Sequence, residues 1–285
     1  MTPRCLLLAL TLALVPSLAA AQSEGRLKRI KDSKSITIAH RTDAPPYSFV
    51  DPAKNPIGYS IDLCKRVVSQ LESQLGVQGL NVKWVPVTTQ TRFEVIAKGE
   101  ADMECGASTV TIGRMKQVDF SSYIFVDSTG LLARADLNAR SLSDLSGKKI
   151  GVIAGTSNES ALQRALKERL VTATVVPLKS REEGLTRLES REIDALASDA
   201  ILLLGLGPKV KAPASLAMLD DALSFEPYAI ALPRGESAFR AEVNIALARI
   251  YRSAAIGEIY SQWFGILGKP SGAVRAVYGM GAIPE

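Results

Sequence analysis

Arg114 and the threonine three residues before it could together hold a carboxylate. The run Ala107-Ser108-Thr109-Val110-Thr111-Ile112-Gly113-Arg114 is typical of a strand end that enters a helix. Thr111 is then placed to cap this helix, and the Arg114 guanidinium presents a planar fork that matches two carboxylate oxygens. An ordinary capped helix with a surface arginine explains the same residues. The rest of the chain must decide between the two interpretations.

A second turn of the same kind lies at Gly155-Thr156-Ser157. It follows the apolar run Lys149–Ile153 and precedes a segment with helical spacing of apolar residues. Backbone N–H groups at such a strand-to-helix turn, together with the Thr156 hydroxyl, form a natural cradle for an anion. A capped helix without any ligand is the commoner use of this sequence pattern.

Short apolar strands alternate with amphipathic helices from Ser35 onward, which indicates an α/β fold. We expect a first series of strands at 35–40, 81–86 and 101–105, and a second at 149–153, 173–177 and 193–197. Long extended runs at 123–134 and 223–232 separate the two series and predict a double crossover between two lobes. A cleft between the lobes is then the expected ligand site, and the two crossovers form a hinge. We expect the glycine-rich run 278–281 to be a terminal loop.

The first 21 residues are predicted to be a secretory signal peptide that is removed on export. Arg4 precedes an apolar run from Cys5 to Leu14, and Ala19 and Ala21 fit the small-residue rule for the cleavage site. A membrane anchor is the alternative, but the apolar run is shorter than the roughly 20 residues that span a bilayer. The mature protein is therefore expected to be exported.

Charge and cysteine content exclude some classes of partner. The formal charge of +5 arises from 34 basic and 29 acidic residues scattered along the chain, which gives little support to nucleic acid as a partner. After export, Cys64 and Cys105 remain as an even pair in an oxidising compartment, which favours a disulfide; two buried free thiols are the alternative. With His40 as the one histidine, we expect no metal site, and no cofactor is implied.

Several motifs together resemble the family 3 periplasmic solute-binding proteins, which deliver polar amino acids to ABC importers. The motifs are Gly58-Tyr59-Ser60-Ile61-Asp62-Leu63, Thr109–Arg114 and Asp119-Phe120-Ser121. Further runs resemble the glutamate/aspartate-binding branch: His40-Arg41, Thr88–Arg92, Glu104-Cys105-Gly106 and Leu188-Glu189-Ser190. The resemblance implies a two-lobed, type II periplasmic-binding-protein fold (a Venus flytrap), with lobe 1 at 22–127, lobe 2 at 128–225 and a return to lobe 1 at 226–285.

The resemblance also implies how the two ends of an α-amino acid are held. Arg114 and the backbone from Ala107 to Thr109 would bind the α-carboxylate, and Thr156 would clamp it from the second lobe. Asp199 would receive the ammonium group, which is sensible because the two ligand ends carry opposite charges. A plain helix N-cap is the alternative role for Asp199.

The ligand side chain is expected to meet a second group of cations. By the resemblance, Arg41 and Arg92 would hold a side-chain carboxylate, with Thr89 as a hydroxyl donor. Two arginines that face one cleft repel each other unless an anion lies between them, so their pairing favours an acidic ligand. Arg181 replaces a second-lobe histidine of this branch and can donate to a carboxylate without pH dependence.

Other residues depart from the pattern or have competing explanations. Val110 and Thr111 stand where the branch usually has asparagines. Tyr47 and Phe49 are expected to line the pocket over the aliphatic part of the ligand, with core packing as the alternative. Trp84 and Trp263 are assigned to core or interlobe packing.

The leading hypothesis is a monomeric periplasmic protein that closes around glutamate or aspartate and presents it to an ABC permease in the inner membrane. It would be a binding protein and not an enzyme; another polar amino acid is the alternative ligand. Cyclohexadienyl dehydratases share the architecture, and Glu159 or Glu104 would then act as acid or base. A ligand-sensing domain is a third option, which would need a separate membrane partner.

Overall fold

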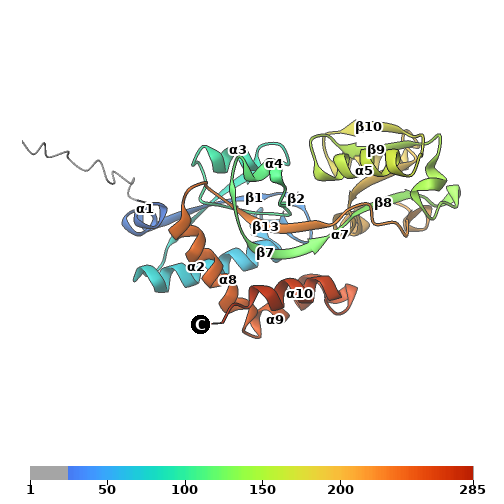
Figure 1. Ribbon diagram of the computed structural model, residues 1–285. Helices are drawn as coiled ribbons and strands as arrows, with labels where there is room; N and C mark the ends of the chain where they lie inside the picture. Colours follow the sequence, from blue (N-terminus) through green and yellow to red (C-terminus); the bar gives the residue numbers. More distant parts are fainter. Residues whose placement is uncertain (1–24, 285) are drawn as a thin grey trace, which may run out of the picture.

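Two five-stranded sheets form the framework of this protein, whose computed structural model describes residues 25–284 (Figure 1). The expected signal peptide at 1–21 lies outside the described residues. The first sheet, the centre of lobe 1, has the order β5 (Asn81–Val87), β1 (Ser35–Arg41), β6 (Met103–Cys105), β13 (Glu226–Leu232) and β7 (Asp119–Asp127). The second, the centre of lobe 2, has the order β10 (Thr174–Leu178), β9 (Lys149–Ile153), β11 (Ala195–Asp199), β8 (Thr129–Arg134) and β12 (Leu216–Met218). The predicted two-lobed α/β fold is therefore confirmed.

Helices cover both sheets. Figure 1 shows one group of lobe 1 helices below its sheet and another above it. The first group comprises α2 (Tyr59–Leu75), α8 (Ser237–Tyr251), α9 (Ala255–Phe264) and α10 (Gly272–Gly281), and the second α3 (Arg92–Ala97) and α4 (Ile112–Met115). The other helices of this lobe and the next are α1 (Arg26–Ser33), α5 (Ser157–Glu168), α6 (Arg181–Glu189) and α7 (Ala200–Leu204). A small sheet of β2 (Asp43–Ala44), β3 (Ser48–Val50) and β4 (Pro56–Ile57) lies beside α2.

The two crossovers between the lobes form where the sequence predicts long extended runs. β7 leads through Ser128 into β8, and β13 brings the chain back to pair antiparallel with both β7 and β6. The two crossover segments therefore lie side by side where the lobes meet, because Glu226 is paired with Asp127. Such a paired connection suits a hinge.

Helix α2 illustrates why these residues form these elements. Its apolar positions Ile61, Cys64, Val68 and Leu71 recur at intervals of three and four, so one face is buried against the sheet. The helix ends at Gly76, which adopts the left-handed conformation with φ of 63°. Cys64 forms a disulfide with Cys105 on β6, as predicted, and so ties the helix to a central strand.

The expected terminal loop at 278–281 is wrong. These residues belong to α10, which begins after Ser271, whose side chain accepts a hydrogen bond from the Val274 N–H. Val274 and Val277 are buried in the lobe 1 core, and the Tyr278 hydroxyl lies 2.8 Å from that of Tyr59. Packing of one apolar face outweighs the low helix propensity of its glycines. None of the described helices is long and apolar enough to cross a bilayer.

Candidate functional site

Most of the predicted ligand-binding side chains meet in one small cavity between the lobes, which we call the arginine cavity. Its lining comprises Arg41, Thr89, Arg92, Ala107, Thr109, Thr156, Ser157, Asn158, Arg181, Asp199 and Leu202. Arg41 ends β1 and Asp199 ends β11, and other lining residues follow β5, β6 and β9. The carboxyl ends of strands in open α/β sheets are where ligands bind, so the topology brings these residues together.

The arginine cavity is very small in this arrangement of the lobes. Its volume is about 10 Å³, which is room for roughly one water molecule. Contacts between the lobes account for this: Arg181 Nη2 donates to the Asp43 backbone oxygen at 2.7 Å, and Ser157 Oγ lies 3.3 Å from Thr109 Oγ1. An amino acid can enter only if the lobes or these side chains move apart.

Arg41 and Arg181 share one carboxylate. Arg41 Nη2 lies 2.6 Å from Asp43 Oδ1, and Arg181 Nη2 lies 3.7 Å from Asp43 Oδ2. Arg41 is almost completely buried, and this burial lowers its pKa to about 10 although Asp43 opposes the shift. Asp43 therefore joins a lobe 1 cation to a lobe 2 cation at the edge of the cavity.

Arg92 is also buried, but no carboxylate of the described residues lies within 4 Å of it. It is 4% exposed, and no described residue accepts a hydrogen bond from its Nε. Its guanidinium carbon lies 4.8 Å from the centre of the Phe93 ring. Burial, followed by the Arg114 cation, lowers the pKa of Arg92 to about 10, so it remains charged at neutral pH. A buried charge of this kind suits an anionic ligand group.

Arg114 lies outside the arginine cavity, in a wider cleft that adjoins it. The adjoining cleft has a volume of about 550 Å³ and shares Thr109, Thr156 and Ser157 with the cavity. Arg114 Nη1 donates to the Thr109 backbone oxygen at 2.7 Å, and its guanidinium carbon lies 5.0 Å from the Phe93 ring centre. Thr111 caps the single turn of α4, as predicted, by accepting from the Arg114 N–H.

The Gly155-Thr156 turn is partly occupied by its own helix. Thr156 Oγ1 accepts from the Glu159 N–H and donates to the Ile153 oxygen, and the Gly155 N–H donates to the Glu159 carboxylate. The Gly155 donor and the Thr156 hydroxyl are therefore already paired, contrary to an open anion cradle. Thr156 still lines both the cavity and the cleft.

Asp199 is the N-cap residue of α7 but makes no capping hydrogen bond with its side chain. Its carboxylate instead meets the Tyr228 hydroxyl, which lies 2.5 Å from Asp199 Oδ1 and 3.4 Å from Asp127 Oδ2. The Ser128 and Ile201 N–H groups both donate to Asp127. Two buried carboxyl groups thus flank one phenol where the lobes join, and Asp199 faces the cavity.

This carboxyl pair predicts a pH-dependent stability. Burial, reinforced by the charge of Asp199, raises the pKa of Asp127 from near 3.8 to about 8. Between those values the folded protein holds a proton that the unfolded chain releases, so the contribution of Asp127 to stability falls as pH rises. Urea unfolding at pH 5.5 and 7.5 measures this effect in wild type and Asp127→Asn. Between these pH values, the free energy of unfolding of the variant should rise by about 2 kcal/mol relative to that of wild type. Parallel changes in the two proteins would contradict this assignment.

The two predicted pocket aromatics do not line the cavity or the adjoining cleft. Tyr47 is fully buried among the rings of Tyr59, Phe125, Tyr228 and Phe264. Phe49 packs edge-on against Trp263, whose Nε1 donates to Asp62. Burial against other aromatic rings removes more apolar surface from water than an exposed cleft does, which favours the core packing.

Sequence reasoning missed several residues at the site. Ser157, Asn158 and Leu202 line the cavity, and Asp43 joins its two arginines. Ser157 and Asn158 could have been predicted as site residues, because they begin the helix that follows the Gly-Thr turn. Asp43 lies two residues after Arg41, but nothing in the sequence pointed to its second partner, Arg181, which is 138 residues away.

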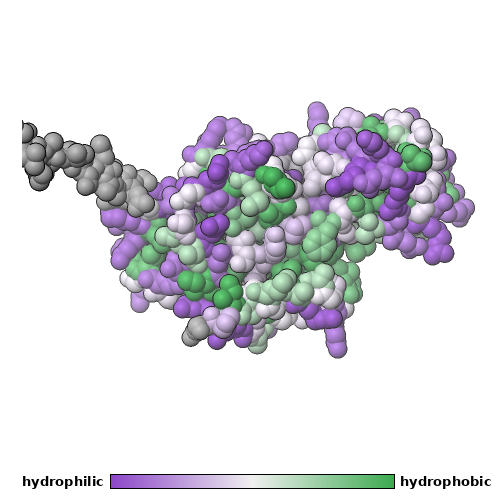
Figure 2. Space-filling model, viewed as in Figure 1, coloured by the Kyte–Doolittle hydropathy of each residue, from purple (hydrophilic) through white to green (hydrophobic). Residues whose placement is uncertain are grey.

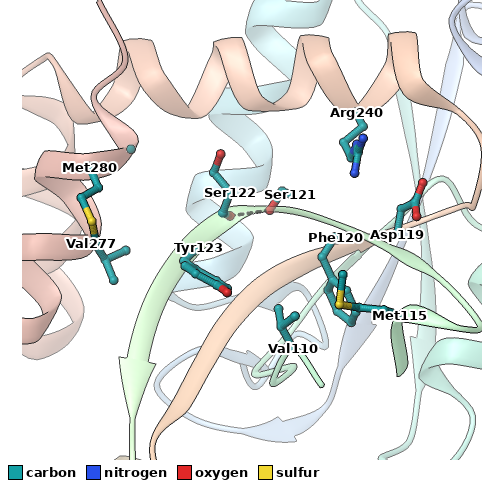
Figure 3. Close-up of a pocket in the computed structure, with 11 residues that line it drawn as sticks. Val110, Met115, Asp119, Phe120, Ser121, Ser122, Tyr123, Arg240, Val277 and Met280 are labelled. Atoms are coloured by element: carbon teal, nitrogen blue, oxygen red, sulfur yellow. Dashed lines mark hydrogen bonds between the residues drawn. The ribbon is translucent and has the colours of Figure 1, made fainter. Parts of the chain in front are cut away.

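Another hollow lies on lobe 1 alone, between α4, β7, α8 and α10 (Figure 3). It has a volume of about 390 Å³ and is lined largely by apolar side chains, among them Met115, Phe120 and Met280. The surface over α10 and the crossover strands shows green side chains mixed with white and pale purple ones in Figure 2. Asp119 and Arg240 are its charged lining residues, and no lobe 2 residue lines it, so closure of the lobes would not enclose a ligand there.

Two α/β lobes, joined by paired crossovers and with buried charges of both lobes around one cavity, define a two-lobed ligand-binding protein of the type II periplasmic fold. The chain belongs to the bacterial extracellular solute-binding proteins, family 3, whose sequence profile matches residues 36–266.

Relatives of known name share most of the chain. It is 35% identical over 247 residues to an L-glutamate/L-aspartate-binding protein of Pseudomonas aeruginosa, covering 86% of this chain and 82% of the relative. It is 29% identical over 260 residues to a glutamate/aspartate import solute-binding protein of Escherichia coli, covering 91% and 86%.

Solved structures show the same fold, one of them with glutamine bound. An ancestral arginine-binding protein bound to glutamine superposes with a TM-score of 0.69 at 26% identity, over 81% of this chain and 98% of the other. An ancestral amino acid-binding protein, described as a precursor of cyclohexadienyl dehydratase, superposes with a TM-score of 0.71 at 24% identity, over 84% and 99%. The shared fold therefore leaves the ligand to be argued from the site.

Proposed function

We propose that this protein binds an acidic amino acid between its lobes in the periplasm and delivers it, as a monomer, to the membrane permease of an ABC importer. The observation that carries the proposal is the gathering of Arg41, Arg92 and Arg181 from both lobes around one buried cavity. Asp199 faces the same cavity and supplies the opposite charge that a ligand ammonium requires. The names of the two bacterial relatives support the same ligand class.

The roles of the two ends follow from the positions of the charges. Arg114 and Thr109 in the adjoining cleft would hold the α-carboxylate, while the arginine cavity would receive the side-chain carboxylate. Opening of the lobes about the paired crossovers gives access, and closing removes the charged groups from water, which strengthens their interactions. A micromolar ligand requires only about 8 kcal/mol, which a few charge-assisted hydrogen bonds supply after ordering costs. No bond in the ligand is made or broken.

A thermal-shift panel of amino acids and dicarboxylates on refolded, ligand-free protein tests this function. Glutamate or aspartate at 1,000 times its dissociation constant should stabilise the protein by about 4 kcal/mol, which is a shift on the order of 10 °C. Glutamine and arginine serve as neutral and basic controls. A shift with a neutral or basic amino acid and none with glutamate or aspartate would show that the ligand class is wrong.

A further inference from the structure

Glu104 is a fully buried carboxylate for which contact with a ligand gives no explanation. It lies on β6 opposite Ala39 and Ala231, in the interior of the lobe 1 sheet, and is 0% exposed. Neither of its oxygens forms an ion pair within 4 Å with a described residue, and it does not line the arginine cavity. A buried anion is costly unless cations compensate it.

Three cations of the site act on this carboxylate. Burial raises the pKa of Glu104, and the Arg92 guanidinium opposes that shift most strongly, followed by the Ser108 hydroxyl and the guanidinium groups of Arg41 and Arg114. Gly106 provides the space, because a Cβ there would lie 2.2 Å from Glu104 Oε1 and 3.2 Å from Arg41 Cγ. The carboxylate and the stem of Arg41 therefore both lie beside Gly106.

Asp43 plays the equivalent part on the other side of Arg41. Its carboxylate oxygens lie 2.6 Å from Arg41 Nη2 and 3.7 Å from Arg181 Nη2, and it too lies outside the lining of the cavity. We call Arg41, Arg92, Arg181, Asp43 and Glu104 the distal charge cluster. Three guanidinium groups and two carboxylates leave this cluster with one net positive charge, since Arg114 and Asp199 are assigned to the α-carboxylate and the ammonium group of the ligand.

We propose that Glu104 and Asp43 are specificity-determining residues, which hold the distal charge cluster at one net positive charge and so match it to a single side-chain carboxylate. The inference rests on the proposed function, since it requires the ligand side chain to reach these arginines. A glutamate side chain neutralises the remaining charge, whereas the isosteric glutamine amide leaves it uncompensated. Both residues act through the arginines and touch no ligand atom.

Glu104→Gln tests the proposal because it removes one charge at nearly constant shape. Calorimetric dissociation constants for glutamate and glutamine at pH 7.5 give the selectivity ratio. With the cluster at two positive charges, the preference for glutamate over glutamine should rise by about tenfold. A loss of packing alone would weaken both ligands and would not raise the ratio. An unchanged or lower ratio overturns the proposal.

Two further variants keep the test decisive. Asp43→Asn removes the other carboxylate at a partly exposed position and should raise the ratio in the same direction, even if Glu104→Gln folds poorly. Asp102→Asn is the matched control, because Asp102 is also a buried lobe 1 carboxylate but pairs with Arg26 and Arg29, away from the cavity. It should leave the ratio unchanged. If wild type does not bind glutamate, the proposed function fails; if it does and the ratios stay constant, only this inference fails.

Discussion

Replacement of Arg114 by alanine is expected to weaken the binding of every amino acid ligand by a factor of about 1,000. The side chain offers two charge-assisted hydrogen bonds to an α-carboxylate, each worth about 2 kcal/mol. It also holds the Thr109 carbonyl through the 2.7 Å bond from Nη1 and packs on the Phe93 ring. The substitution therefore removes a ligand group and the support of its neighbour. Titration calorimetry with glutamate and glutamine measures the loss for an acidic and a neutral ligand.

Two further variants distinguish the residues that bind the two ends of the ligand. Arg114→Lys keeps the positive charge but not the planar fork, so its loss should be intermediate. Arg92→Ala should weaken glutamate by about a hundredfold and glutamine far less, because Arg92 lies in the arginine cavity and not in the adjoining cleft. Equal losses for Arg92→Ala and Arg114→Ala with both ligands would contradict a site with distinct ends.

The family resemblance pointed to the cations of the site, and the positions of two of them also carry a local signal. Arg41 stands at the end of an apolar strand and Arg92 at the start of an amphipathic helix, and the alternation of strands and helices places such ends at one edge of a sheet. Asp199 was found in the same way, at the end of β11. Period predicts only that these residues lie at the ends of strands and helices. The role of each residue toward a ligand came from the family resemblance.

The partners of these residues could not be predicted, because they come from distant parts of the chain. Tyr228, whose hydroxyl contacts Asp199, lies on the returning crossover strand. Asp43 contacts Arg181 from the opposite lobe. The same limit explains α10: its glycines argue for a loop, and only the core contacts of Val274 and Val277 favour a helix. Likewise, Tyr47 can be recognised as a core residue only from the aromatic rings that surround it.

The lobes also approach each other closely through backbone at Gly205. Gly205 follows α7, the helix after Asp199, and a Cβ added there would lie 2.3 Å from the backbone oxygen of Pro45. Pro45 follows β2, which carries Asp43. Backbone cannot move aside as a flexible side chain can, so a larger residue at this position must push α7 and the Asp43 segment apart. The Arg181 contact with Asp43 would be lost with them.

Gly205→Ala is accordingly expected to weaken glutamate binding by about a hundredfold, although the methyl group touches no ligand. Its backbone has φ of −63° and ψ of −14°, which alanine adopts readily, so the effect would come from the interlobe contact and not from helix strain. If the closed arrangement becomes a minor state, apparent affinity falls in proportion to its population. Gly207→Ala is the matched control, because no heavy atom lies within 4 Å of its added Cβ. Calorimetry gives the affinity, and small-angle scattering with saturating glutamate should show Gly205→Ala remaining more extended than wild type. Wild-type affinity in Gly205→Ala would mean that the Pro45 contact is not needed for the lobes to close on the ligand.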